Sequence, residues 1–598
     1  MKYSFSCLRD TLWVLLLLLA GMEANAQAPA WQTLASIVDA PGVNPLVSAT
    51  TVDANGNVFM VGRFSGTVNL GSIVLTSAGA TDAFVAKWSL ASRAFVWARQ
   101  AGGTGTDEAS AVAISGANVY VGGSFNGSTA SFGSLALTNS STDCLQNSPS
   151  DMFVTKLVDA GSSASFVWAQ RPVGIFSESC THLAVNGNQV YLTGNMISSQ
   201  YIPIPGSNQC LSANIVTFGA TTLRNIGPGQ LGFVGKLTDM GSGATFGWAS
   251  TVGGDGTNVV NDLVLQGSNV YLAGSFGGTY MLFGPPVLGG ELFVNFNTNN
   301  GPNGFVLKLS DTGSSIGLVW AQHINGTAYE QVSRLAIRGT DVYVAGEFSS
   351  ALTVGTTALT TAGGSDAFIA KLTDNGSSSL FAWAQRMGGT GNDAITAFAV
   401  QGTSVYAAGT FNSATANFGS TTLSNPAAGG QNPSTLFVAK LLDAGTGAFG
   451  WAKGVNGTGY TVPTTLTLDG GRVNIIGKAS TTAAFDNLTF PSQASNSALF
   501  LASLADPTLT AIAHSLHAES IHLFPNPAHN RSTVQLPAVP GAATAILTIL
   551  DALGRTLRTQ TAATNTKADL DLTGLAPGLY AVRVAAGGNT ATQKLVVE

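Results

Sequence analysis

The chain has 598 residues, more than one small core can organise, so we expect several domains or one large repeat assembly. Only 9% of the residues are charged and 72 are glycine, a composition that favours short strands and tight turns over helices. The net charge of −6, with 25 Lys and Arg residues, leaves no basic patch, so we expect no nucleic-acid partner.

The first 26 residues have the pattern of an export signal. Lys2 and Arg9 supply positive charge, residues 12–20 form an apolar run, and residues 24–26 read Ala-Asn-Ala, a small-residue cleavage site. The apolar run is too short to span a bilayer, and no later run is long enough. We therefore predict a signal peptide over 1–26 and an exported mature chain without a transmembrane segment.

A short segment centred on tryptophan recurs along most of the chain. It reads Phe-Val-Trp-Ala at its clearest, and successive tryptophans are 63 to 80 residues apart. They are Trp97, Trp168, Trp248, Trp320, Trp383 and Trp451, with an isolated Trp31 upstream. A self-similar period of this kind indicates a repeat architecture.

Each repeat contains four short apolar runs bounded by Gly, Asn and Asp, which predict four strands. In the repeat that ends at Trp451 these runs lie at 394–400, 405–409, 436–441 and 449–452, with an excursion at 416–423. Counting the inner strands gives seven units. Four-stranded antiparallel units cannot bury both faces alone, whereas a radial arrangement lets each unit cover the next. We therefore predict an all-β fold with a seven-bladed β-propeller over 27–512; the alternative, a β-solenoid, has much shorter rungs.

The two ends of the repeat region predict how it closes. Trp31 stands alone before the first complete unit, and the last unit has residues 501–511 with no tryptophan after them. We predict that residues 31–34 supply the outermost strand of the last unit, beside the strand around Phe500. The alternative is that residues 508–513 complete that unit themselves. A linker is expected at 513–520.

Three motifs of the repeat carry a resemblance. They are Asp82-Ala-Phe-Val-Ala-Lys87, Val342-Tyr-Val-Ala-Gly346 and Gly388-Gly-Thr-Gly-Asn-Asp393. Together they resemble a bacterial β-propeller repeat family over roughly residues 31 to 510. The resemblance implies the fold and adds little about activity.

A polar residue recurs just before the inner strand of five units. The five are Asp107, Glu178, Asn258, Glu330 and Asp393, whereas the first and last units have Pro45 and Thr461 there. Oxygen ligands ringing one mouth of a central channel could hold Ca²⁺ or another hard cation. The alternative, which we favour, is that each side chain accepts backbone N–H bonds within its own glycine-rich turn. Apart from this speculative Ca²⁺ ring, we expect no cofactor.

Two further repeated residue types have simpler interpretations. Asp-x-Gly recurs at Asp159, Asp239, Asp311, Asp374 and Asp443; its spacing to the next aromatic residue does not fit sialidase Asp-boxes, so we predict hairpin turns. Lysines follow a core phenylalanine by three positions at Lys87, Lys156, Lys236, Lys308, Lys371 and Lys440. We expect their stems on sheet surfaces with the ammonium groups in water, and the tryptophans as packing anchors.

The longest excursions are the predicted binding face. They lie between the second and third strands of three units, at 126–150, 197–230 and 277–303. Variable loops on a rigid scaffold usually carry recognition. Cys144, Cys180 and Cys210 lie in or beside two of these loops, and their odd number in an exported protein predicts one disulfide and one free thiol, with the pairing left open.

A different pattern fills residues 521–598. Short strands at hairpin spacing predict a small Ig-like β-sandwich. Its motifs are Phe524-Pro-Asn-Pro527, Asp551-Ala-Leu-Gly-Arg555, Leu575-Ala-Pro-Gly-Leu-Tyr580 and the tail from Lys594. The module resembles the C-terminal sorting domain of the type IX secretion system of Bacteroidetes. That resemblance implies passage through the periplasm, recognition of residues 521–598 by the secretion machinery, and a location outside the cell or on its surface.

Three functions remain open at this point. The first is a secreted or cell-surface binding or adhesion scaffold for a glycan or protein. The second is a propeller enzyme acting on polysaccharide, but no unit carries a unique His, Tyr, Arg and carboxylate set for such chemistry. The third is a purely structural surface component. We favour binding and expect no enzymatic activity and no catalytic residue.

Overall fold

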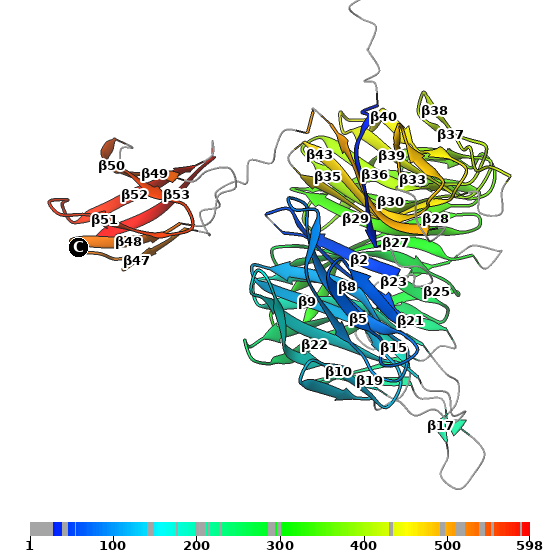
Figure 1. Cartoon of the computed structure of the whole chain (residues 1–598), viewed down its shortest axis with the longest axis horizontal. Coiled ribbons are helices and arrows are strands. Elements are labelled where there is room, and N and C mark those ends of the chain that lie inside the picture. The colour runs from blue at the N-terminus through cyan, green and yellow to red at the C-terminus, as the bar shows by residue number, and fades with distance from the viewer. Residues whose placement is uncertain are drawn as a thin grey trace, which may run out of the picture. The chain divides into compact units, whose positions relative to one another are not determined.

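The computed structural model describes residues 28–598 except 39–45, 54, 140–148, 175–176, 198–201, 204–209, 212–213, 226–228, 285–292, 296–300, 430–433, 470, 491–496, 507, 510–520, 537–543, 552–554 and 587–588. Within this part every regular element is a β-strand (Figure 1). No helix there has the length and apolar character to cross a membrane. The chain divides into two compact units; the first includes Asn57–Leu468 and Val473–Ala505, and the second includes Asp506–Glu598.

The first unit is built from antiparallel groups of four strands. The group formed by the repeat that ends at Trp451 is typical. Its strands β35 (Asp393–Gln401), β36 (Ser404–Phe411), β39 (Thr435–Leu442) and β40 (Ala448–Gly454) follow one another in space as in sequence. These bounds contain or closely match the four predicted runs. The strong apolar runs predicted the strands because the middle two are buried on both faces.

The same order recurs in five more groups of four strands, the last three of which belong to six-stranded sheets. They are β2 (Leu46–Val52), β3 (Asn57–Phe64), β6 (Asp82–Ser89) and β7 (Ala94–Ala101); β8 (Asp107–Ser115), β9 (Asn118–Phe125), β12 (Asp151–Asp159) and β13 (Ala164–Gln170); β15 (Ser177–Asn186), β16 (Gln189–Ile197), β21 (Gln230–Asp239) and β22 (Ala244–Gly254); β23 (Asn258–Gln266), β24 (Asn269–Phe276), β27 (Asn303–Asp311) and β28 (Ile316–Gly326); and β29 (Glu330–Arg338), β30 (Asp341–Phe348), β33 (Asp366–Asp374) and β34 (Ser379–Gly389).

The excursions between second and third strands fold mainly as hairpins. The hairpins are β4 (Thr67–Leu70) with β5 (Ile73–Thr76), β10 (Thr129–Phe132) with β11 (Leu135–Thr138), β19 (Asn214–Phe218) with β20 (Thr221–Asn225), β25 (Tyr280–Phe283) with β26 (Phe293–Val294), β31 (Ala351–Val354) with β32 (Thr357–Thr360), β37 (Thr415–Phe418) with β38 (Thr421–Ser424), and β44 (Ala483–Phe485) with β45 (Leu488–Thr489). Shorter strands are β14 (Val173–Gly174), β17 (Ile202–Pro203), β18 (Cys210–Leu211) and β41 (Asn456–Gly457). Several hairpins pair with the last strand of the preceding sheet, as β25 pairs with β22, and so connect neighbouring repeats.

The seventh sheet joins the two ends of the repeat region. Its order is β1 (Trp31–Val38), β46 (Ser497–Ala505), β43 (Arg472–Ser480) and β42 (Thr461–Asp469). Strand β1 runs antiparallel to β46, with Ser36 opposite Phe500, and appears dark blue among yellow and orange strands (Figure 1). The predicted N-terminal strand is therefore confirmed. The alternative at 508–513 is wrong because β46 already has a strand on each side; residues 510–513 lie outside the described part.

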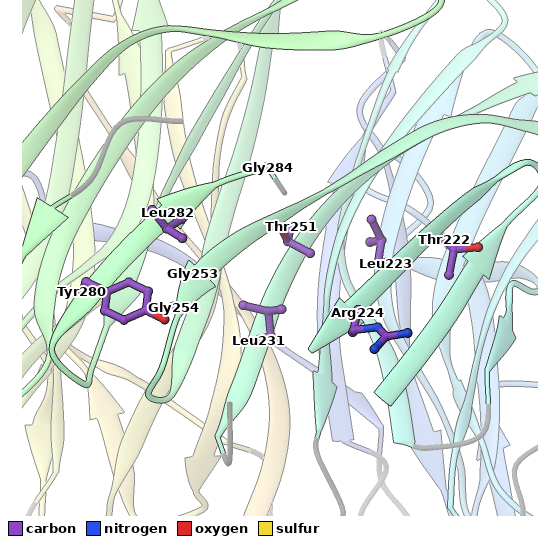
Figure 2. Close-up of a pocket in the computed structure, with 10 residues that line it drawn as sticks. All are labelled: Thr222, Leu223, Arg224, Leu231, Thr251, Gly253, Gly254, Tyr280, Leu282 and Gly284. Atoms are coloured by element: carbon purple, nitrogen blue, oxygen red, sulfur yellow. The ribbon is translucent and has the colours of Figure 1, made fainter. Parts of the chain in front are cut away.

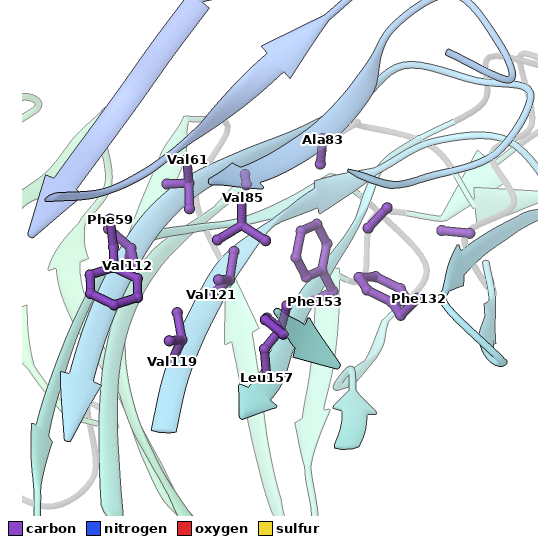
Figure 3. Close-up of a cluster of buried hydrophobic side chains, with 14 of the residues drawn as sticks. Phe59, Val61, Ala83, Val85, Val112, Val119, Val121, Phe132, Phe153 and Leu157 are labelled. Atoms are coloured by element: carbon purple, nitrogen blue, oxygen red, sulfur yellow. The ribbon is translucent and has the colours of Figure 1, made fainter. Parts of the chain in front are cut away.

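Side chains from consecutive sheets interdigitate to form the core. In one cluster Phe59 and Val61 of β3 meet Val119 and Val121 of β9 in the next sheet (Figure 3). A matching cluster joins the last sheet to the first. The last sheet contributes Ile476, Leu499 and Leu501, and the first contributes Val47, Val58 and Met60. Each fully buried side chain of this size contributes about 1.5–3 kcal/mol, so inter-sheet packing supplies much of the stability.

The second unit consists of two antiparallel sheets with a common core. One contains β47 (His522–Phe524), β48 (Arg531–Gln535) and β51 (Lys567–Asp571); the other contains β50 (Thr556–Ala563), β49 (Thr544–Leu550), β52 (Gly578–Ala586) and β53 (Asn589–Val597). Alternate residues of both sheets, such as Val534 and Val582, are buried together. This is the arrangement expected of a small β-sandwich.

Replacing Trp31 by alanine tests whether β1 completes the last sheet. Its indole N–H donates to the carbonyl of Gly454 at 3.1 Å, and its ring packs edge-on against Phe485 at 4.9 Å. We expect Trp31→Ala to lower the free energy of unfolding by about 3–5 kcal/mol because it leaves a cavity beside β46. Denaturant unfolding measures this, and Gln32→Ala, an exposed neighbour on the same strand, is the control. Equal stability of both variants would contradict a structural role for β1.

Candidate functional site

Aspartate clusters join five of the sheets to the sheet that precedes each of them. Asp311, at the end of β27, accepts hydrogen bonds from three side chains of the preceding sheet: Nζ of Lys236 at 2.7 Å, Nε1 of Trp248 at 3.0 Å and the hydroxyl of Tyr191 at 2.7 Å. It also accepts the backbone N–H of Gly313 in its own turn at 2.8 Å. The Asp311 carboxylate therefore closes its hairpin and anchors the neighbouring sheet at once.

The same set of side chains recurs along the first unit. The clusters are Asp239 with Lys156, Trp168 and Tyr120; Asp374 with Lys308, Trp320 and Tyr271; Asp443 with Lys371, Trp383 and Tyr343; and Asp159 with Lys87 and Trp97. In the last of these Phe59 stands where the others have tyrosine. The repeat period therefore carries a four-residue network.

The prediction that the repeated lysines extend into water is wrong. Lys156 and Lys236 are 5% and 4% exposed, and each ammonium group pairs with the aspartate of the next sheet. The buried ammonium group is stabilised because the negatively charged carboxylate oxygen of the aspartate lies 2.6–2.7 Å from the lysine Nζ. The hairpin interpretation of Asp-x-Gly is correct but omitted this second role. The co-occurrence of Lys, Trp, Tyr and Asp in each repeat was the available signal.

The electrostatics of this aspartate cluster keep it charged. Burial opposes ionisation of Asp311, but hydrogen bonds from Lys236 and Tyr191 outweigh it, so the pKa of Asp311 is lowered. Burial and the bond to Asp311 raise the pKa of Tyr191 well above its usual range. The carboxylate stays ionised and the phenol neutral at physiological pH, which suits a structural ion pair rather than an acid–base pair.

The residues predicted to hold a cation lie at sheet edges with contacts to their own turns. Asp107 accepts the N–H of Gly103 at 2.7 Å. Asp393 accepts the N–H of Gly389 at 2.8 Å, Glu330 accepts that of Ala328 at 3.2 Å, and Asn258 donates to the carbonyl of Gly256 at 2.7 Å. Glu178 is buried near the start of β15.

No three His, Cys, Asp or Glu side chains in the described part converge as a metal site would require. The four acidic members of the predicted ring, Asp107, Glu178, Glu330 and Asp393, form no such group among the residues that the structure describes. The cation ring stays a prediction, and the turn role is the one for which contacts exist.

Cys180 is a buried free thiol on β15. Burial raises its pKa above the usual range, which makes it a poor nucleophile. Cys144 lies outside the described residues, and only the backbone of Cys210, in β18, is described. The predicted disulfide therefore stays a prediction.

A cavity of about 180 Å³ opens between two of the long excursions (Figure 2). One wall comes from β20, the other from β25, and the base from β21 and β22. The lining residues are Thr222, Leu223, Arg224, Leu231, Thr251, Gly253, Gly254, Tyr280, Leu282 and Gly284. Two of the three excursions predicted as the binding face, 197–230 and 277–303, thus contribute to one cavity. Loop length was the only sequence signal, and it did not identify these side chains.

The chemistry of the cavity is that of a small binding site. Leu223 and Leu231 are buried and supply apolar surface, whereas Arg224 is exposed and Tyr280 is half-buried. Among the described residues the Arg224 guanidinium has no ion pair or hydrogen bond, so it is available to a guest. A volume near 180 Å³ is below that of sites for drug-sized molecules and accommodates one sugar residue or one amino-acid side chain.

The motifs of the second unit have structural reasons. Asn526, between two prolines, donates to the carbonyl of Lys594 at 2.7 Å and accepts the N–H of Val596 at 2.9 Å, so it ties the first strand to the last. Asp551 accepts two hydrogen bonds from Arg555 across the turn between β49 and β50. The Tyr580 hydroxyl donates to the carbonyl of Ala576 at 2.8 Å.

The second unit matches a known family. A family model described as "Secretion system C-terminal sorting domain" matches residues 522–598, which confirms that resemblance and indicates export by type IX secretion to the cell surface or extracellular space. No curated protein matches the chain. The β-propeller repeat family stays a prediction.

Similar solved structures are only distant. They include the apo AtxE2 isopeptidase at 8% identity, covering 76% of this chain and 60% of that one with a TM-score of 0.24. The match to the full extracellular region of plexin A4 has 8% identity and a TM-score of 0.28, and it covers 94% of this chain and 53% of that one. The match to latent dimeric PorU from Porphyromonas gingivalis has 9% identity and a TM-score of 0.13, and it covers 68% of this chain and 31% of that one. The chain thus spans little more than half of the first two structures. At these TM-scores the similarities carry no argument about fold or activity.

Two tyrosine changes test the aspartate cluster in opposite directions. We expect Tyr191→Phe to lower the free energy of unfolding by about 2 kcal/mol, because the charged Asp311 loses a buried donor. Phe59→Tyr should raise it by about 1 kcal/mol, because the new hydroxyl can reach Asp159 as the tyrosines of the other clusters reach theirs. Paired unfolding curves measure both. A destabilising Phe59→Tyr change would contradict the equivalence of the clusters.

Removing residues 522–598 tests the export role of the second unit. We expect the full chain outside the cell or on its surface and the truncated chain retained in the cell. Cell fractionation with antibodies against the first unit measures the distribution. A full-length chain carrying Val74→Ala, an exposed change on β5, is the control and should be exported normally. Equal export of the truncated chain would contradict the sorting role.

Proposed function

We propose that the first unit is a seven-bladed β-propeller that binds an extracellular glycan or protein in the cavity between β20 and β25. The protein would act as a secreted or surface-displayed binding scaffold, reaching that location through the periplasm with the help of residues 522–598. The observation that carries the binding proposal is the cavity, because the two excursions that diverge most in length converge on it.

Three features support the propeller. The described strands of the first unit include seven groups of four paired strands, three of them within six-stranded sheets; each group follows chain order except the last, which includes β1 from the N-terminus. Consecutive sheets share hydrophobic clusters, and one cluster joins the last sheet to the first. A radial arrangement gives every sheet two neighbours in this way, whereas an open stack would leave two end faces uncovered.

The lining favours binding over catalysis. None of the described lining residues is Asp, Glu, His or Cys, so the cavity offers no general acid and base for glycoside cleavage. Arg224 and Tyr280 instead supply one cation and one aromatic ring, groups that hold polar guests in place. A polysaccharide-active enzyme and a purely structural surface component remain the alternatives, without a specific observation in their favour.

A glycan array probed with the mature chain tests the binding proposal. We expect selective binding, reduced at least about tenfold by Arg224→Ala and by Tyr280→Ala, since each removes a contact of roughly 1.4 kcal/mol or more. The control is Val74→Ala, which lies on the corresponding hairpin strand of the first repeat. Repeating the array with and without Ca²⁺ tests the predicted cation ring.

The outcomes separate the candidates. Binding that both cavity variants leave unchanged would contradict the cavity as the site, although the scaffold role would stand. No binding to any glycan would redirect the search to protein ligands, with crosslinking from Arg224 or Tyr280 positions on the native surface as the next measurement.

A further inference from the structure

Two buried carboxyl groups meet where two consecutive sheets adjoin. Asp366 is the first residue of β33 and Asp393 the first of β35 in the next sheet; their exposed fractions are 0% and 1%. The strand starts are tied together by the bond from the Asp393 N–H to the Ser365 carbonyl at 2.8 Å. A Cβ placed on Gly388, whose φ is +143°, would lie 2.6 Å from both Asp366 Oδ1 and Asp393 Oδ2. The glycine is required there because the two carboxyl groups occupy that space.

Each carboxyl group has one oxygen with a donor and one without. Asp366 Oδ2 accepts hydrogen bonds from Arg386 and from the N–H of Ala362, and Asp393 Oδ2 accepts the N–H of Gly389. Oδ1 of Asp366 and Oδ1 of Asp393 are buried and have no donor among the described residues. Two unsatisfied buried acceptors in adjoining carboxyl groups are costly, so a donor is expected at this pair.

The charges at this seam, the contact between the starts of β33 and β35, also favour a proton shared by the two carboxyl groups. The charged groups that face Asp393 are Asp366 of β33 and Arg386 of β34. With both aspartates ionised, one buried negative charge would remain unbalanced, which is strongly unfavourable. Burial, opposed by the Gly389 N–H and reinforced by the neighbouring Asp366, raises the pKa of Asp393 to about 7.

We propose that Asp393 is protonated and donates an O–H hydrogen bond to Asp366, so that one shared proton joins the two sheets. A single proton supplies a donor for Asp366 Oδ1 and removes the excess charge. A calcium ion fits less well because it takes six to eight oxygen ligands, and the described residues offer two unsatisfied oxygens at this pair. This role for Asp393 is independent of ligand binding and replaces the predicted place of Asp393 in a cation ring.

The equivalent pair between the first two sheets is built differently. Asp107 accepts an N–H on each of its oxygens, from Gly103 and from Asn126, and Asp82 accepts from Ser77 and Ala78. Every one of these oxygens has a donor from the protein. We therefore place the shared proton between Asp366 and Asp393 and not between Asp82 and Asp107.

The proposal has a defined pH dependence. The pKa of Asp393 is raised in the folded protein, whereas in the unfolded chain an aspartate titrates near 4. Stability from the proton is therefore complete below about pH 4 and is lost progressively as the pH rises to about 7. Above that pH both states are deprotonated and no further change is expected. The contact between these two sheets is therefore more stable at mildly acidic pH than at neutral pH.

Hydrogen exchange of the full mature chain at pH 5, 6, 7 and 8 tests this pH dependence. Wild type is compared at each pH with Asp393→Asn, whose amide can donate to Asp366 Oδ1 at every pH. For peptides covering 388–395 we expect the ratio of wild-type to variant exchange rates to rise by up to about tenfold per pH unit between pH 5 and 7 and then to level off. The control is Asp311→Asn, which should weaken its own segment at all four pH values because Asp311 is ionised throughout.

Two results would overturn the proposal. One is a ratio of exchange rates that does not change with pH. The other is protection at 388–395 that Ca²⁺ restores and a chelator removes at pH 8, which would assign a cation to the site. Infrared difference spectra provide a second readout: a protonated carboxyl band present at pH 5, lost at pH 8 and absent from Asp393→Asn supports the shared proton, and its absence from wild type contradicts it.

Discussion

The ion pair between a lysine of one sheet and an aspartate of the next is the interaction on which the first unit depends. Asp239 and Asp311 show the principle: each ends a third strand, closes the following turn, and accepts Lys, Trp and Tyr donors from the sheet before it. A buried ion pair is costly unless its remaining hydrogen-bonding capacity is used. These carboxylates accept four hydrogen bonds, so removing any partner leaves a buried charge incompletely satisfied.

Because the first unit depends on these ion pairs, the repeats share the strands that carry them and differ in the loops that do not. The second and third strands of each sheet, which carry the tyrosine and the lysine of a cluster, have 8 to 10 residues in every repeat, because each cluster needs these side chains in register with the next aspartate. The excursions between second and third strands take no part in these clusters and vary freely in length. The cavity lies between two such excursions, where a change of side chain does not disturb the ion pairs.

The seams between sheets also differ at the strand starts. Asp366 and Asp393 each have one oxygen with no donor among the described residues, whereas the oxygens of Asp82 and Asp107 accept hydrogen bonds from N–H and hydroxyl groups. Arg386 accounts for part of this difference between the two pairs. It neutralises the carboxylate of Asp366, with which it forms an ion pair, but not that of Asp393. Repeats with the same backbone can therefore differ in their response to pH.

The sequence alone determined the strands, the seven repeats, the role of the N-terminal strand and the sorting module. These features depend on local apolar runs, turn residues and motif spacing, which neighbouring residues encode. Strand β1 was predictable because a lone Trp31 segment lacked the rest of its repeat. The tertiary structure decided which polar side chains meet: the burial of Lys236, the double role of Asp311, the pairing of Asp366 with Asp393, and the walls of the cavity. Each of these contacts joins positions from different sheets, and only the packing of those sheets determines the distance and exposure of their side chains.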